Sequence, residues 1–296
     1  MKTLFNFPKG QNEFYFAFFI LMLTTAVFPQ SSLIYNEQDK AKWSLTTSFQ
    51  VSGGGYTNNE YNTLYLLYGG IRYQNNNFIL YGYIPLVAQN NSGFTQSGMM
   101  IVPTSRGTEG EGGMLNGGNM HGGNNSVNQM SGMDMQISLG DFYLSGSYQA
   151  LNEFNHSIDL FINPGIKFPT ASYSTGIGTG EFDYGFSFNA RRSIESFVIL
   201  AEAGFIKLGD PGGTAYKDPF TYGVGLGKFI SQNGNSILIY FYSYTKILEN
   251  YEPPRQLSLG LNLKLDSTKF LSFIGSKGLS SYSPDFSASA GINFNL

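Results

Sequence analysis

The segment Phe286–Leu296, which reads FSASAGINFNL, decides the fold because apolar and polar residues alternate along its whole length. Successive side chains of a β-strand point to opposite faces, so one face would carry Phe, Ala, Ile and Leu, and the other Ser, Gly and Asn. A helix would mix these residues around its surface. The segment therefore predicts a strand with one apolar and one polar face.

The same period of two recurs along the rest of the chain. Between residues 256 and 265, Leu stands at every second position, with Gln, Ser, Gly, Asn and Lys in between. Taken over the whole sequence, the pattern predicts twelve strands. They are expected at 43–53, 60–73, 76–87, 137–151, 156–168, 181–192, 196–208, 220–230, 235–248, 254–265, 268–278 and 285–296.

Strand length and loop length both favour a membrane barrel. Most expected strands span 11–14 residues, whereas strands of soluble sheets peak near about 5–6. Short connections such as 74–75 alternate with long ones such as 88–136, as in barrels with tight periplasmic turns and longer outer loops. Lipid offers no partner to backbone N–H and C=O groups, so only a closed sheet can span it. We expect an all-β fold, a transmembrane antiparallel up-and-down β-barrel in the bacterial outer membrane; a soluble β-sandwich is the alternative.

Several Tyr and Phe residues lie near the ends of the expected strands. Aromatic side chains gather at membrane–water interfaces, so we interpret these residues as the interfacial girdle of the barrel. They are Tyr68, Tyr73, Tyr83, Tyr148, Phe168 and Tyr222.

The composition excludes several classes of protein. Among 296 residues there is no Cys and there are only two His, so disulfides, Cys nucleophiles and zinc–thiolate sites are excluded. A net charge of −3 argues against nucleic acid as a partner. His156 and Ser157 are adjacent at an expected strand start and would point to opposite faces, so they cannot form a catalytic pair. We expect no enzymatic activity and no cofactor.

Residues 1–32 have the pattern of a signal peptide. Lys2 and Lys9 precede the apolar run Phe14–Phe28, which is shorter than the roughly 20 residues that a membrane helix needs. The alternative is that this run is retained as an N-terminal anchor. We expect cleavage near residue 32 and a barrel formed by residues 33–296.

Short motifs from Gly140 onward follow one another in a recognisable order. They are Gly140–Phe142, Pro164–Thr170, Gly178–Glu181, Asp183–Gly185, Leu208–Pro211, Tyr222–Leu226, Ser276–Ser280 and Ser283–Phe286. In these motifs the chain resembles the outer-membrane β-barrel transporters of the family named for the MetA pathway of phenol degradation. The resemblance implies an outer-membrane barrel that passes small molecules, aromatic compounds among them. The loop at 88–136 has no counterpart in the family pattern.

Charged residues on the polar strand faces are the candidates for a path through the barrel, because lumen side chains meet the solute. Both signs occur, so these residues either form a structural ion-pair network or guide a solute. The candidates are Asp141, Asp159, Lys167, Glu181, Asp183, Arg191, Glu202 and Lys264.

The expected outer loop at about 88–136 is rich in Gly and Asn and holds seven of the nine Met residues. Thioether and imidazole ligands together favour the soft ions Cu(I) and Ag(I). The candidate ligands are Met120, His121, Met130, Met133 and Met135. A flexible loop of low complexity is the alternative interpretation.

The sequence and the resemblance together predict an outer-membrane channel for small molecules, aromatic or apolar ones in particular. Its expected partners are outer-membrane lipid and a small solute. Two alternatives stay open: an outer-membrane protein that binds Cu(I) or Ag(I) through the Met-rich loop, and a structural or adhesive barrel without transport.

Overall fold

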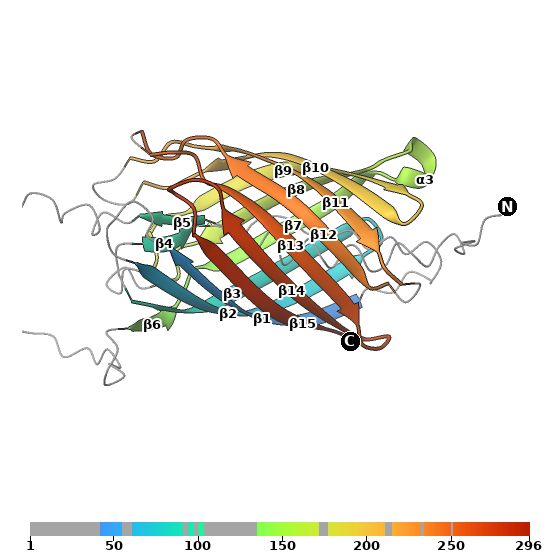
Figure 1. Cartoon of the computed structure of the whole chain (residues 1–296), viewed down its shortest axis with the longest axis horizontal. Helices are drawn as coiled ribbons and strands as arrows, with labels where there is room; N and C mark the ends of the chain where they lie inside the picture. Colours follow the sequence, from blue (N-terminus) through green and yellow to red (C-terminus); the bar gives the residue numbers. More distant parts are fainter. Residues whose placement is uncertain are drawn as a thin grey trace, which may run out of the picture.

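The computed structural model describes residues 42–54, 61–90, 94–97, 100–103, 135–171, 177–210, 215–231, 234–249 and 251–296. The expected signal peptide lies outside these residues. A single closed antiparallel β-barrel contains most of them (Figure 1). Its strands are β1 (Lys42–Gly54), β2 (Asn62–Asn75), β3 (Phe78–Gln89), β6 (Gln136–Leu139), β7 (Phe142–Leu151), β8 (Asp159–Phe168), β9 (Asp183–Ile194), β10 (Phe197–Lys207), β11 (Phe220–Phe229), β12 (Ser236–Tyr244), β13 (Arg255–Lys264), β14 (Lys269–Gly278) and β15 (Phe286–Asn295).

The barrel closes where the first and last strands meet. β1 pairs with β15 from Ser44 opposite Asn295 to Gly53 opposite Phe286, and its other edge pairs with β2. The remaining strands pair with their neighbours in sequence. Closure leaves no free sheet edge, which is the condition for a sheet to cross lipid.

β6 and β7 are two parts of one wall strand, so the barrel has twelve strands, as predicted. Both parts pair with β3: Leu139 lies opposite Leu86, and Tyr143 lies opposite Tyr83. The β6–β7 side therefore holds one residue more than β3 over this stretch, which is a β-bulge at Gly140 and Asp141. The bulge turns the Asp141 side chain into the barrel, where it is buried.

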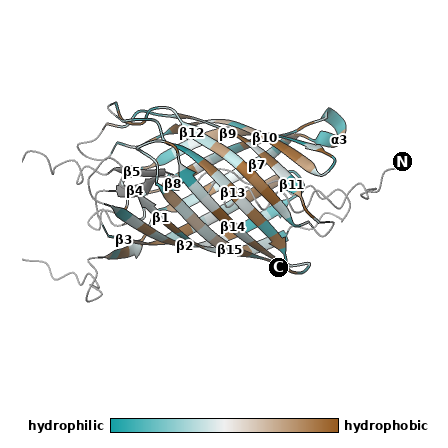
Figure 2. Ribbon diagram, viewed as in Figure 1, coloured by the Kyte–Doolittle hydropathy of each residue, from teal (hydrophilic) through white to brown (hydrophobic). Residues whose placement is uncertain are grey.

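The two faces of the sheet have the expected character. In β13, Leu257 and Leu259 point outward and are 39% and 63% exposed, whereas Ser258 and Asn262 point inward and are 1% and 0% exposed. Figure 2 shows hydrophobic and hydrophilic residues following one another in bands along the strands. A sheet that is closed and apolar outside is a membrane barrel, and it excludes the β-sandwich alternative.

The two ends of the barrel differ. Short connections and the C-terminus lie at one end, the turn end, together with the four-residue helix α3 (Glu153–His156) (Figure 1). The Asn152 side chain caps this helix by accepting a hydrogen bond from Phe154 N at 2.8 Å, so β8 begins at Asp159 and later than expected. No helix among the described residues is long and apolar enough to cross a membrane. Longer connections lie at the opposite, loop end.

The expected outer loop at 88–136 contains a short hairpin that the sequence analysis did not predict. Strands β4 (Phe94–Ser97) and β5 (Met100–Pro103) pair antiparallel, with Phe94 opposite Pro103 and Ser97 opposite Met100. Thr, Ile, Val and Phe in these strands favour extended backbone. Figure 1 shows the hairpin at the loop end.

The prediction of an interfacial girdle is wrong for two of its six residues. Tyr68 and Tyr83 point into the barrel and are 3% and 4% exposed, whereas Tyr148 and Tyr222 point outward and are 53% and 46% exposed. The physical reason is that the inner face of β2 and β3 is itself apolar: Leu66 shares the inner face with Tyr68. A closed interior buries aromatic rings as effectively as the membrane interface does.

Candidate functional site

The barrel interior is lined by buried tyrosines from two opposite walls. One group comes from β2, β3 and β7, and the other from β12, which lies across the ring of strands from β3. Both groups belong to one continuous hydrophobic cluster, so side chains connect the two walls through the interior. The first group is Tyr68, Tyr81, Tyr83 and Tyr143, and the second is Tyr240, Tyr242 and Tyr244.

Ring stacking orders each tyrosine group. The rings of Tyr83 and Tyr143 are 4.7 Å apart and inclined by only 4°. On the facing wall, Tyr242 and Tyr244 meet edge to face, with centroids 5.0 Å apart at 89°. Both are favoured geometries of aromatic pairs. Contacts of this kind fix the orientation of the rings in the barrel interior.

Two glycines of β11 leave room for Tyr240 of β12 to reach across β11 to β10. An added Cβ at Gly223 would lie 2.5 Å from Tyr240 Oη, and one at Gly225 would lie 2.4 Å from Tyr240 Cδ2. The Tyr240 ring therefore lies directly on the backbone of β11. From there its hydroxyl donates a hydrogen bond of 2.9 Å to Glu202 Oε2 on β10.

Glu202 is 6% exposed. Its second oxygen, Oε1, has no hydrogen-bond partner among the described residues. The hydroxyl of Tyr242, next to Tyr240 on the inner face of β12, adds a second, weaker hydrogen-bonding interaction with the same carboxyl group.

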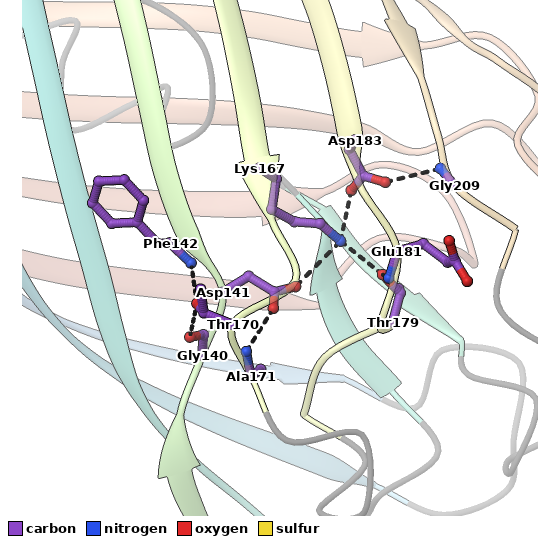
Figure 3. A network of polar contacts seen from close by, with 10 residues as sticks. All are labelled: Gly140, Asp141, Phe142, Lys167, Thr170, Ala171, Thr179, Glu181, Asp183 and Gly209. Carbon is purple, nitrogen blue, oxygen red and sulfur yellow. Dashed lines mark hydrogen bonds and ion pairs between the residues drawn. The ribbon is translucent and has the colours of Figure 1, made fainter.

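A buried ion cluster joins β7, β8 and β9 near the loop end (Figure 3). Lys167 Nζ lies 3.2 Å from Asp141 Oδ2 and 2.8 Å from Asp183 Oδ2. The same ammonium group donates to Thr179 Oγ1 at 2.7 Å. Buried ions of opposite charge with further hydrogen bonds of this kind stabilise a fixed geometry.

The two carboxylates of this cluster also hold the segments beyond the strands. Asp141 Oδ1 accepts a hydrogen bond from Ala171 N at 2.9 Å, and Asp183 Oδ1 accepts one from Gly209 N at 3.0 Å. Both donors follow the loop-end termini of β8 and β10. The cluster therefore connects the segments that follow β8 and β10 to the barrel wall.

A second buried ion pair lies near the turn end. Arg191 Nε donates to Asp159 Oδ2 at 2.9 Å. Asp159 Oδ1 accepts from Gln149 Nε2 at 2.9 Å and from Glu153 N, the first residue of α3, at 2.8 Å. This pair ties the β7–β8 connection to β9.

The eight candidate path residues thus fall into distinct groups. Glu181 is exposed and precedes β9. Lys264 is half-buried at the end of β13, and its backbone N–H donates to Asn235 Oδ1 at 2.9 Å. Glu202 is buried among tyrosines. The residues held in buried ion pairs are Asp141, Lys167, Asp183, Asp159 and Arg191.

Most of the proposed metal ligands lie outside the described residues. These are Met120, His121, Met130 and Met133, whereas Met135 is half-buried just before β6. Within the described part of the chain, no group of three or more His, Cys, Asp or Glu side chains could hold a metal ion. Metal binding by the Met-rich segment stays a prediction.

Sequence reasoning missed two features of the interior. Arg72 of β2 is buried, and its Nη2 donates to Gln74 Oε1 at 2.6 Å. The signal was present, because Arg72 is an even number of residues from Leu66 on the inner face. The tyrosine lining was missed because its members were assigned to the girdle or to no site.

Comparison with known proteins agrees with the architecture. No protein-family model matches the chain, and no curated protein matches it in sequence. Its structure is similar to the COG4313 outer membrane channel from Pseudomonas putida F1, with a TM-score of 0.60 and 13% identity over 88% of this chain and 98% of that chain. Weaker similarities include the KdgM porin, with a TM-score of 0.45 and 9% identity over 85% of this chain and 98% of that chain. Another is a mutant of the monoaromatic hydrocarbon channel TodX, with a TM-score of 0.40 and 9% identity over 88% of this chain and 90% of that chain. At these identities the likeness concerns the fold: the chain is a twelve-stranded β-barrel of the bacterial outer membrane.

Proposed function

We propose that the protein is a channel for small molecules with a preference for aromatic or apolar solutes. The observation that carries this proposal is the tyrosine-lined interior, in which rings from opposite walls belong to one buried cluster. A solute with an aromatic ring can stack on these faces, each contact being worth about 0.5–1.5 kcal/mol. A sugar of similar size gains less from the same faces. The sequence resemblance to aromatic-compound transporters of the MetA-pathway family supports the same solute class.

In this proposal the buried ion pairs stabilise the barrel and do not select the solute. Lys167 and Arg191 are already neutralised by aspartates within hydrogen-bond distance. A passing solute would have to break these pairs to use their charge, at a cost of several kcal/mol. We therefore assign them to holding the wall and its connections, and assign solute selection to the tyrosines.

Flux through the purified barrel in liposomes tests this function. The two solutes are phenylacetate and a neutral sugar of similar size, and faster flux of the aromatic solute is expected. Tyr83→Ala, which removes an inward ring, is expected to lower the aromatic-to-sugar flux ratio roughly two- to tenfold. Tyr148→Ala removes an outward ring that is 53% exposed and serves as the matched control with an unchanged ratio. Absence of flux for both solutes would contradict a channel, and equal flux would contradict the aromatic preference.

A further inference from the structure

Glu202 differs from the other carboxyl groups buried in the barrel. Asp141 and Asp183 contact Lys167, and Asp159 contacts Arg191. The polar groups that act on Glu202 are instead the hydroxyls of Tyr240 and Tyr242. Among the described residues, no ion pair involves Glu202.

The position of Glu202 places its side chain inside the barrel, midway along the wall. It is the central residue of β10, and its side chain lies on the inner face with Val198 and Leu200. Strand pairing places it beside Asn189 of β9 on one side and Gly223 of β11 on the other. Gly223 has no side chain, so Tyr240 and Tyr242 reach the carboxyl group from β12 across this strand.

In such surroundings a carboxyl group either takes up a proton or needs a positively charged partner. A buried carboxylate without a cation is costly, because the apolar interior does not replace the hydration that the charge loses. One oxygen is satisfied by Tyr240 Oη at 2.9 Å, and the other, Oε1, is left without a donor among the described residues. A ligand with a positively charged N–H group would supply both the donor and the counter-charge.

The tyrosines complete the chemistry of such a site. Aromatic faces attract cations through the ring quadrupole, and their rings stack on apolar groups. We propose that Glu202, Tyr240 and Tyr242 form a binding site for a primary organic ammonium ion with an aromatic or apolar body. The ammonium group donates to Glu202 Oε1, and the body of the ligand packs on the tyrosines. This proposal rests on the channel function and narrows its solute class to amines.

Binding to the purified, folded barrel in detergent tests the site, with isothermal titration of phenethylammonium and of phenylacetate as probes. Wild type is expected to bind phenethylammonium at least about tenfold more tightly, because a hydrogen bond to a charged group and a cation–π contact both favour it. Glu202→Gln is expected to abolish this preference. Glu195→Gln, at an exposed turn between β9 and β10, is the matched control and is expected to keep the preference for phenethylammonium.

Tyr240→Phe provides a second variant, which keeps the ring and removes the hydroxyl that orients the carboxyl group. It is expected to weaken phenethylammonium binding several-fold and to leave phenylacetate binding unchanged. Folding of each variant is checked by the heat-dependent shift of its band in gel electrophoresis. Unchanged amine preference in folded Glu202→Gln or in Tyr240→Phe, or absence of saturable amine binding to wild type, would overturn the site.

Liposome flux of phenethylammonium separates the site from the function on which it rests. Binding that depends on Glu202, without flux of any solute, would uphold the site and refute the channel. Flux of aromatic solutes that is equal for the amine and the acid, and that Glu202→Gln does not change, would uphold the channel and refute the site.

Discussion

Tyr240 and Glu202 are joined by a hydrogen bond of 2.9 Å that passes over an intervening strand. The contact depends on Gly223 and Gly225 of β11, because a side chain at either position would occupy the space of the Tyr240 ring. A glycine pattern in one strand therefore determines where a side chain of the next strand lies. The hydrogen bond in turn fixes the orientation of an acidic group inside the barrel.

Gly225→Ala is expected to displace the Tyr240 ring, because the new Cβ would lie 2.4 Å from Tyr240 Cδ2. Forcing an extra methyl group into a packed interior typically costs about 1–3 kcal/mol. The free energy of unfolding, measured by urea titration in detergent micelles, should fall by this amount. Gly275→Ala in β14 is the matched control, since no atom lies within 4 Å of its added Cβ. Equal losses in the two variants would mean that the Tyr240 ring does not lie against the backbone of β11 at Gly225.

Lys167→Met is expected to destabilise the barrel strongly, because it leaves the carboxylates of Asp141 and Asp183 buried without their cation. Breaking a buried ion pair in this way costs about 3–5 kcal/mol. Urea unfolding measures the loss. Lys207→Met breaks the half-exposed pair with Asp218, 2.9 Å apart, and should cost no more than about 1 kcal/mol.

A triple variant separates charge from packing in the Lys167 cluster. Replacing both aspartates by Asn in the Lys167→Met background removes the two unpaired charges, so most of the lost stability should return. No recovery in the triple variant would show that the packing of the lysine stem, and not the charge balance, holds the cluster together.

The barrel itself could be predicted from the sequence. Alternation in segments such as Phe286–Leu296 encodes which side of a strand faces lipid, and the membrane requires closure. The bulge at Gly140 and Asp141 could not be read in this way. A strict period of two would put Asp141 on the same face as Leu139, yet Leu139 is 54% exposed and Asp141 is 4% exposed. A single added residue changes the face, and nothing in a periodic pattern marks it.

The interior could be predicted only in part. Charged residues on polar faces were expected to point inward, and Lys167 and Asp159 do so because their hydrophobic neighbours face lipid. The role of Tyr83 was misassigned, because an aromatic residue suits both the interface and a packed lumen. Which environment holds the ring depends on strand register. The partners of Glu202 were also unpredictable, since they come from a strand beyond β11.

Leu259→Arg tests the lipid face of β13. Leu259 is 63% exposed and lies in the middle of the strand, so arginine there would meet the centre of the bilayer at a cost of about 2–4 kcal/mol. Leu265→Arg is the matched control, because Leu265 lies in the turn after β13 and is 53% exposed. Near the interface the cost falls to about 0–1 kcal/mol. Folding into liposomes, followed by urea unfolding, should show this difference; equal costs would contradict the membrane position of the barrel.

The stability of the turn between β13 and β14 is expected to depend on pH through the carboxyl group of Asp266. Its Oδ1 accepts hydrogen bonds from Thr268 N at 2.7 Å, Thr268 Oγ1 at 2.8 Å and Lys269 N at 2.9 Å. These bonds, the one from the Thr268 backbone first, lower the pKa of Asp266 from 3.8 to about 2. Because the pKa is depressed in the folded state, the stabilisation is fully present above about pH 4 and is lost as the pH falls towards 2.

Asp266→Asn is therefore expected to lower the urea midpoint at pH 6, and the difference from wild type should shrink as the pH falls from 4 to 2. Asparagine can accept a hydrogen bond from Thr268 but carries no charge, so the variant isolates the charge-assisted part of the contact. Asp285→Asn, at another exposed position, controls for the loss of one negative charge. A difference that stays constant down to pH 2 would mean that the ionised carboxylate does not stabilise this turn.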